Sequence, residues 1–220
     1  MAECSPAEGF NTGIPEAEQM LQNLDRFSHH FVLACLMDRQ IKAERAWAVP
    51  YWIGAHAHVG GWDFPAFEKL DLRTAKKIFK DRSLHRFNDK MPEIFVSGIR
   101  QIAKRYDGVA KNIWSGNPRC ARVIRRFLEF DGAGPKIATM ATNILIRQFK
   151  IPMTDRSAID ISGDVQVMKY FVSHKLLRSN AKREELIYLA REIYPAYPGL
   201  LDLLAWEHGR AIRARTKKSN

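Results

Sequence analysis

Two apolar helical stripes, separated by a glycine-containing break between residues 117 and 149, constrain the fold more than any other feature of this chain. In both stripes the apolar residues recur at steps of three and one, the spacing of one buried face of an α-helix. The segment Asp131-Gly-Ala-Gly-Pro135 between them cannot continue a helix. We therefore predict two packed helices joined by a tight turn. The stripes comprise Cys120, Val123, Ile124, Phe127 and Leu128, then Ile137, Met140, Ala141, Ile144 and Leu145.

This turn predicts an anion-binding helix start. Pro135 suits the first turn of a helix, because its missing N–H would have no helical partner there. The unpaired N–H groups and the dipole of a helix start both favour negative charge, and glycine lets a phosphate approach the backbone closely. An ordinary helix–helix corner is the alternative interpretation of the same residues.

The rest of the chain predicts an almost entirely α-helical protein, because its long segments show helical periodicity and none alternates like a strand. Pro50 should bend or break the second segment, and Gly60 and Gly61 should end it. We expect helices at about 15–37, 42–58, 64–69, 72–80 and 91–106, and a short helical piece among turns at 107–116.

The charge balance favours a polyanionic partner. The 220 residues, enough for one large or two interlocked domains, include 35 Lys and Arg against 24 Asp and Glu, a formal net charge of +11. Such a surplus neutralises phosphates and releases counterions, although many basic proteins bind no nucleic acid. The basic C-terminal stretch, residues 208–220, should add nonspecific phosphate contacts or simply keep the chain soluble.

The chain predicts an intracellular protein, in the cytoplasm or nucleoid, or in the nucleus of a eukaryote. Its first residues include acidic ones and no apolar run, unlike a signal peptide. No stretch approaches the roughly 20 apolar residues of a membrane helix. Cys4, Cys35 and Cys120 match no disulfide framework and no zinc spacing, which is typical of a reducing compartment.

No metal site is expected. The pairs His29-His30 and His56-Ala-His58 have no acidic or cysteine partners at ligand spacing. A group of aromatic residues is predicted to be core, with stacking on a flipped base as the alternative. These residues are Trp47, Tyr51, Trp52, Trp62 and Phe64.

Three segments resemble the endonuclease III superfamily of helix-hairpin-helix DNA glycosylases. Phe130-Asp-Gly-Ala-Gly-Pro-Lys136-Ile-Ala138 resembles its hairpin, roughly Leu-Pro-Gly-Val-Gly-x-Lys-Thr-Ala. Asp164-Val-Gln-Val-Met-Lys169 resembles its following helix start, with Gln for the usual His and Lys for the usual Arg. Leu36-Met-Asp-Arg-Gln40 resembles the helix end that carries a glutamine able to enter the duplex. The resemblance spans about residues 30–175.

The resemblance implies an all-α fold in which two helical subdomains flank a DNA-binding cleft. One would be a helical barrel of residues 41–145, which includes the helix-hairpin-helix at about 117–149. The other would be built from both termini, residues 1–40 plus 146–220. The implied protein is a monomer that binds double-stranded DNA containing a damaged base or an abasic site.

The resemblance also implies a chemistry, base excision with associated AP-lyase activity. Lys136 would attack C1′ and form a Schiff base that permits β-elimination, which requires a neutral amine. Asp164 would stabilise the positive charge that develops on the sugar. Gln40 would fill the space that the flipped base leaves. The backbone of Gly132, Ala133 and Gly134 would bind phosphate.

Two departures from the family pattern narrow this expectation. The separation of Lys136 and Asp164, 28 residues, is longer than the family usually shows, so Asp155 and Asp160 remain alternatives. We prefer Asp164 because the residues that follow it fit the pattern. The chain also lacks cysteine beyond Cys120, so no iron–sulfur cluster is expected and the resemblance is to branches without one, which include the 8-oxoguanine glycosylases.

Two other functions remain open at this stage. One is a monofunctional glycosylase in which Asp164 activates water and Lys136 only contacts DNA. The other is a noncatalytic helix-hairpin-helix module that holds phosphates with the same amides. The excised base also stays open among oxidised pyrimidines, 8-oxoguanine, uracil and alkylated purines.

Overall fold

The computed structural model describes residues 9–202, 205 and 208, and every element within them is a helix. One isolated bridge pairs Arg119 with Thr154. The predicted all-α class is confirmed. The α-helices are α1 (Pro15–Gln22), α2 (Leu24–Met37), α3 (Ala43–Gly54), α4 (Phe64–Glu68), α5 (Leu72–Asp81), α6 (Met91–Tyr106), α7 (Cys120–Leu128), α8 (Pro135–Arg147), α9 (Val165–Ser173) and α10 (Arg183–Ile193). Short 3₁₀ helices are η1 (Ala110–Ile113), η2 (Arg156–Ala158) and η3 (Pro198–Leu200). Cys4 and the basic residues 209–220 lie outside the described part.

One predicted helix differs from the observed one, because α3 continues through Pro50 without a break and ends at Gly54, well before residue 58. The following loop folds back on the helix end. The indole N–H of Trp62 donates to the Tyr51 carbonyl over 3.1 Å, and the Gly61 N–H donates to the Gly54 carbonyl over 3.2 Å. A side chain at Gly54 would meet the Trp62 ring at 2.4 Å. Tertiary packing of one indole therefore ends α3.

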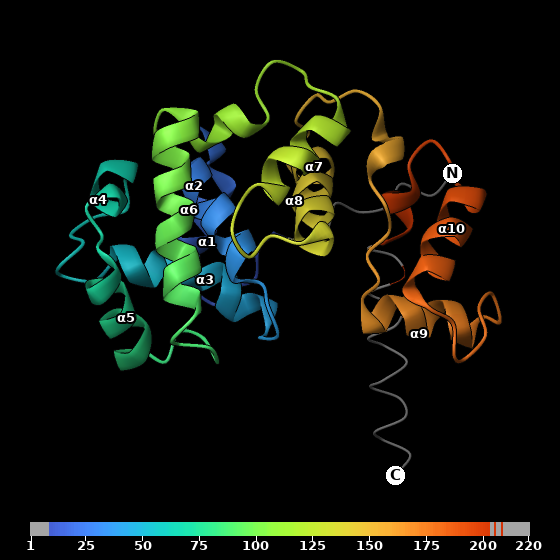
Figure 1. The fold of residues 1–220 in the computed structure, drawn as a ribbon, viewed down its shortest axis with the longest axis horizontal. Coiled ribbons are helices and arrows are strands. Elements are labelled where there is room, and N and C mark those ends of the chain that lie inside the picture. The colour runs from blue at the N-terminus through green and yellow to red at the C-terminus, as the bar shows by residue number, and fades with distance from the viewer. Residues whose placement is uncertain (1–8, 203–204, 206–207, 209–220) are drawn as a thin grey trace, which may run out of the picture.

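Helix α2 lies at the centre of the larger of two hydrophobic clusters. Every residue from 28 to 37 is buried, and α2 contacts α1, α3, α6 and α8. Side chains of α9 and α10 form the smaller cluster, which also includes Ile161 and Ala205. Figure 1 shows α9 and α10 to one side of the other helices, joined to α8 by an extended segment. No described helix combines the length and the apolar character needed to cross a membrane.

These clusters divide the chain differently from the expected subdomains. Helices α1 and α2 pack into the same cluster as α3 to α8, rather than with the C-terminal helices. The reason is that the second half of α2, residues 31–37, is apolar on all its faces, and such a segment must be surrounded by other helices. The division into two subdomains, residues 41–145 and residues 1–40 plus 146–220, stays a prediction.

Two adjacent histidines in α2 are buried and share one hydrogen-bond acceptor. The Nε2 atoms of His29 and His30 each lie 2.9 Å from the Trp62 carbonyl oxygen, so each ring donates a proton to it and both can be neutral. Burial lowers the pKa of His29 from 6.5 to about 4. Burial, with the neighbouring His29, lowers the pKa of His30 from 6.5 to about 3.

We predict that acid destabilises the fold through these histidines. The folded-state pKa of each histidine lies below the unfolded value of 6.5. At a pH between the folded and unfolded pKa values, the unfolded chain therefore binds more protons than the folded protein. The free energy of unfolding should be highest above pH 6.5 and fall below it by up to about 1.4 kcal/mol per pH unit for each histidine. Urea denaturation at several pH values between 8 and 5 measures this slope. His30→Gln, whose amide can still donate to Trp62, should about halve the slope, and equal slopes in parent and variant would contradict the assignment.

Candidate active site

The turn between α7 and α8 places its two glycines differently. Gly132 has a φ of +82°, and a Cβ there would lie 2.9 Å from the Ile94 side chain of α6, so both the backbone and the packing need glycine. Gly134 caps the start of α8, and nothing lies within 4 Å of a Cβ built there. The Ala133 N–H already donates to the Phe130 carbonyl over 3.0 Å. Of the predicted phosphate-binding residues, Gly134 is therefore the one with open space at the helix start.

Lys136 and Asp164 lie together. Lys136 is the second residue of α8, and its Nζ donates a hydrogen bond to Asp164 Oδ2 over 3.1 Å. The two side chains are 43% and 24% exposed, so the ion pair is reachable from solvent. The structure thus brings together the two residues that the resemblance assigned to catalysis, although they belong to different helices.

The position of Asp164 follows from its local structure. It is the N-cap of α9, where its Oδ1 accepts the Gln166 N–H over 2.9 Å. Both carboxylate oxygens are therefore engaged, one by the helix and one by Lys136. The preceding residue, Gly163, lies against α10, since a Cβ there would meet Arg183 Cγ at 2.3 Å. Glycine at this position lets α10 approach the residue before the cap.

The alternative carboxylates bind other partners. Asp160 receives two hydrogen bonds from the Arg191 guanidinium, at 2.8 and 2.9 Å. Asp155 accepts from Arg119 Nε over 3.2 Å and also pairs with Ser157. Of the three candidates, Asp164 is the one that contacts Lys136.

Two further carboxylates, which the sequence did not single out, interact electrostatically with the pair. Burial raises the pKa of Asp38, while the positive charge of Lys136 opposes and the negative charge of Asp164 reinforces this shift. Burial also raises the pKa of Asp202, which accepts hydrogen bonds from the Ser162 hydroxyl (2.7 Å) and N–H (3.2 Å). Asp202 interacts electrostatically with Lys136 and Asp164 as well. Asp38 stands two residues before Gln40, but nothing in the local pattern indicates that it faces α8.

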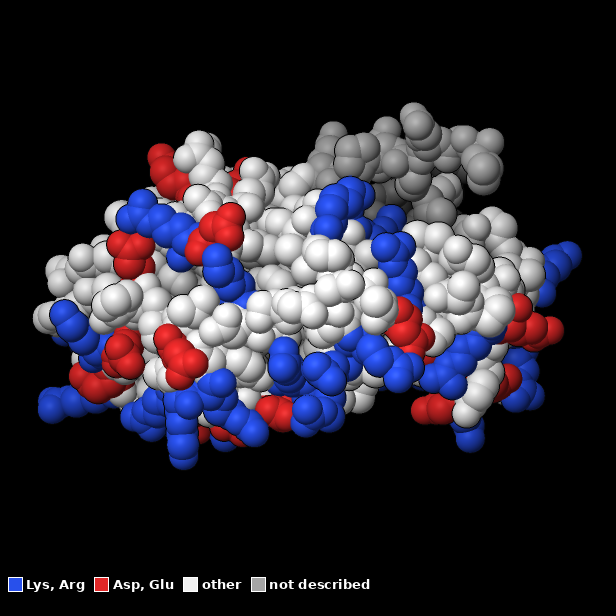
Figure 2. Space-filling model, turned by 90° about the horizontal axis from the view of Figure 1, so that it is seen from above, with Lys and Arg blue, Asp and Glu red and all other residues white. Residues whose placement is uncertain are grey.

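Gln40 lies in the loop between α2 and α3. It is exposed, with a φ of +54°, and the described structure shows no hydrogen bond from it to the Lys136–Asp164 pair. It borders a hollow of about 640 Å³, whose other lining residues are Ile41, Lys42, Arg45 and Arg86. The hollow has three basic residues in its lining and no acidic one. In Figure 2, Lys and Arg side chains gather along one long edge of the molecule, with acidic side chains among them.

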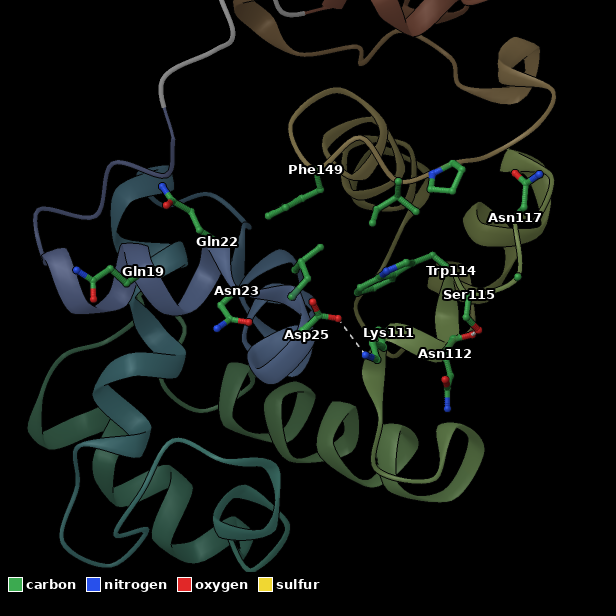
Figure 3. Close-up of a pocket in the computed structure, with 14 residues that line it drawn as sticks. Gln19, Gln22, Asn23, Asp25, Lys111, Asn112, Trp114, Ser115, Asn117 and Phe149 are labelled. Atoms are coloured by element: carbon green, nitrogen blue, oxygen red, sulfur yellow. Dashed lines mark hydrogen bonds and ion pairs between the residues drawn. The ribbon is translucent and has the colours of Figure 1, made fainter.

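A second hollow, of about 720 Å³, lies away from the ion pair. It is lined by amide side chains near the start of α2 and by Phe149 just past α8, and Lys111 and Asp25 pair across its edge at 3.0 Å (Figure 3). Since α8 rises about 1.5 Å per residue, this hollow is roughly 20 Å along α8 from Lys136. The residues with acid–base and nucleophilic chemistry therefore mark the candidate site, and this hollow does not.

Within the described ranges, no group of three or more His, Cys, Asp and Glu side chains is placed to hold a metal ion. The Nε2 atoms of His29 and His30 are both hydrogen-bonded to the Trp62 carbonyl. Of the aromatic residues predicted to be core, Trp47 and Phe64 are buried, whereas Tyr51, Trp52 and Trp62 are only half-buried. No known protein family, curated protein or solved structure matches this chain.

Substitutions of Asp164 should separate its role as a helix cap from its charge. Asp164→Asn keeps an oxygen that can accept the Gln166 N–H, whereas Asp164→Ala removes it. We expect the Ala variant to be less stable than the Asn variant by about 1 kcal/mol, the usual cost of a lost cap. The Asn variant should stay within about 1 kcal/mol of the parent, because a partly exposed ion pair contributes little. Urea denaturation measures both, and equal stabilities of the two variants would show that the cap contributes nothing.

Proposed function

We propose that this protein is a base-excision-repair DNA glycosylase with associated AP-lyase activity. It acts inside the cell, as a monomer, on double-stranded DNA with a damaged base or an abasic site. The observation that carries the proposal is the 3.1 Å contact between Lys136 Nζ and Asp164 Oδ2, made from two helix starts 28 residues apart. The resemblance in sequence assigns these same two residues to catalysis, and they meet although the connection between them is long.

The geometry suits attack on a sugar. Lys136 supplies an amine that is partly exposed and held at a helix start, next to a carboxylate. The amine forms a bond to C1′ while the bond from C1′ to the base breaks, and the opened sugar then yields a Schiff base. Asp164, held by the hydrogen bond that it accepts from the Gln166 N–H, would stabilise positive charge on the sugar.

Two surface features support duplex DNA as the substrate. The α7–α8 turn, as a helix-hairpin-helix, offers the open helix start at Gly134 to a phosphate. The hollow beside Gln40 has basic residues in its lining, which suits the backbone of DNA on either side of a flipped nucleotide. Gln40, exposed at the rim of this hollow, would then enter the duplex.

Borohydride trapping tests the nucleophile. We expect the parent to be covalently trapped on a duplex with an abasic site, and Lys136→Gln to lose trapping while still binding the duplex. Lys104→Gln, which removes the same charge from an exposed position in α6, is the matched control and should trap like the parent. Trapping of Lys136→Gln at the parent level would refute the assignment.

The same experiment separates the two other functions. Release of a base without trapping in the parent would indicate a monofunctional glycosylase in which Asp164 activates water. Binding with neither trapping nor base release, over duplexes that carry 8-oxoguanine, an oxidised pyrimidine, uracil or an alkylated purine, would indicate a noncatalytic DNA-binding protein. With an active parent, this panel identifies the excised base.

Gly134→Ala tests the phosphate site. The residue has a φ of −95° and open space around a Cβ, so the variant should fold and lose at most about 1 kcal/mol of stability. A methyl group at the helix start would hinder the approach of a phosphate, so duplex affinity should fall about tenfold, the equivalent of one charge-assisted hydrogen bond. Fluorescence anisotropy at fixed salt measures this, and an unchanged affinity would place the phosphate elsewhere.

A further inference from the structure

Two buried polar atoms without a hydrogen-bond partner lie close to Asp164. They are Nε of Arg183 and Oε1 of Gln166, and the described residues hold one other such atom, Nε2 of Gln101. A buried donor or acceptor that is left unpaired costs stability, so each one in a folded protein needs an explanation. Gln166 binds Asp164 with its N–H, and Arg183 packs on the residue before Asp164. Two of the three unpaired atoms therefore lie next to the proposed catalytic carboxylate.

Arg183 lies across Gly163. A Cβ built at Gly163 would be 2.3 Å from Arg183 Cγ, 2.5 Å from its Cδ and 2.6 Å from its Nε. The stem of the arginine therefore fills the space that a side chain at position 163 would need. Gly163 is followed directly by Asp164, whose Oδ2 accepts the Lys136 N–H over 3.1 Å. This packing places the arginine one residue away from the proposed catalytic pair.

The Arg183 guanidinium has no partner among the described residues. No hydrogen bond or ion pair reaches it, and its Nε is buried, whereas its two terminal nitrogens are open to solvent. The neighbouring arginines are paired. Arg178 donates two hydrogen bonds to Glu185, and Arg191 donates two to Asp160. Arg183 is therefore the arginine of α10 whose charge remains available to a ligand.

The position of Arg183 in its helix is also unfavourable for a cation. Arg183 is the first residue of α10, and the positive end of the helix dipole disfavours a positive charge there. The acidic residue that would best offset this charge, Glu185, is used by the capping box of α10 and by Arg178. An unpaired cation at such a position is a local conflict, and conflicts of this kind are found mainly at functional sites.

We propose that the Arg183 guanidinium binds a DNA phosphate next to the nucleotide that reacts. The N–H groups of a guanidinium match the oxygens of a phosphate and form two parallel hydrogen bonds with it. The sugar that Lys136 attacks has a phosphate on either side, so a cation beside Asp164 can bind one of them while C1′ faces the amine. This inference rests on the proposed function.

This phosphate site is separate from the one proposed at the α7–α8 turn. Gly134 begins α8 and offers backbone N–H groups, whereas Arg183 begins α10 and offers a charged side chain. The stem of Arg183 is already fixed against Gly163 in the absence of DNA. Little side-chain entropy is therefore lost when the guanidinium binds a phosphate, which favours the contact.

The test measures affinity for a duplex with a tetrahydrofuran analogue of an abasic site, which cannot form a Schiff base. Each of the phosphates nearest the analogue is replaced in turn by a neutral methylphosphonate. For the parent, one of these replacements should lower the affinity about tenfold, the equivalent of one charge-assisted hydrogen bond. For Arg183→Gln the same replacement should have no further effect, because the contact is already lost. A residue with only a structural role would leave the effect of every replacement unchanged.

The variants are chosen to change the charge and keep the packing. Arg183→Gln retains the Cγ and Cδ atoms that lie against Gly163 and loses no partner, so its urea midpoint should match that of the parent. It should bind the unmodified duplex about tenfold more weakly than the parent, with a slope of log affinity against log salt that is smaller by about 0.9. Arg73→Gln, at an exposed position in α5 far from α10 (Figure 1), is the matched control and should keep the full methylphosphonate effect.

Arg183→Lys keeps the charge without the paired N–H groups, so it should recover part of the affinity. Should Arg183→Gln fail to fold, Arg183→Lys carries the test. Its methylphosphonate effect should be smaller than that of the parent, and an equal effect would overturn the inference.

The two proposals can fail separately. If the parent binds duplex DNA but neither traps nor cleaves at an abasic site, the proposed function is wrong, and the methylphosphonate comparison still shows whether Arg183 contacts a phosphate. If the parent is active and every methylphosphonate lowers the affinity of Arg183→Gln as much as that of the parent, Arg183 binds no flanking phosphate and the proposed function stands. A parent that binds no DNA would overturn both.

Discussion

The burial of α2 on all its faces is the constraint on which the rest of the structure depends. From residue 28 to residue 37 the helix has no exposed side chain, so α1, α3, α6 and α8 must all pack around it. Packing against α2 therefore helps to position α8, whose first turn carries Lys136.

Three carboxylates near one lysine repel one another, which costs stability. The hydrogen bonds that compensate for this repulsion differ from one carboxylate to the next. Asp164 is stabilised by Lys136 and by a helix start, and Asp202 by the hydroxyl and N–H of Ser162. Asp38 has neither kind of support and sits at the wrong end of a helix dipole. In proteins such local conflicts are found mainly at functional sites.

The ion pair also joins the two hydrophobic clusters. Lys136 belongs to a helix of the larger cluster, and Asp164 begins a helix of the smaller one. The relative placement of α8 and α9 therefore decides whether the amine and the carboxylate meet.

The sequence by itself determined the local structure. The apolar period located the helices from residue 15 to residue 147, and the glycine segment before Lys136 marked the break between α7 and α8, because both signals act over a few residues. The family pattern also selected Lys136 and preferred Asp164, but it left two other aspartates open.

Only the tertiary structure decided which residues far apart in the sequence contact one another. Arg191 binds Asp160 and Arg119 binds Asp155, which leaves Asp164 to meet Lys136, and none of these pairings has a local signal. The packing of Trp62 on α3 ended that helix early for the same reason. Asp38 is a further example, because no pattern in the residues around it predicts its interaction with Lys136 of α8. Periodicity records which face of a helix is buried, but it does not record what that face meets.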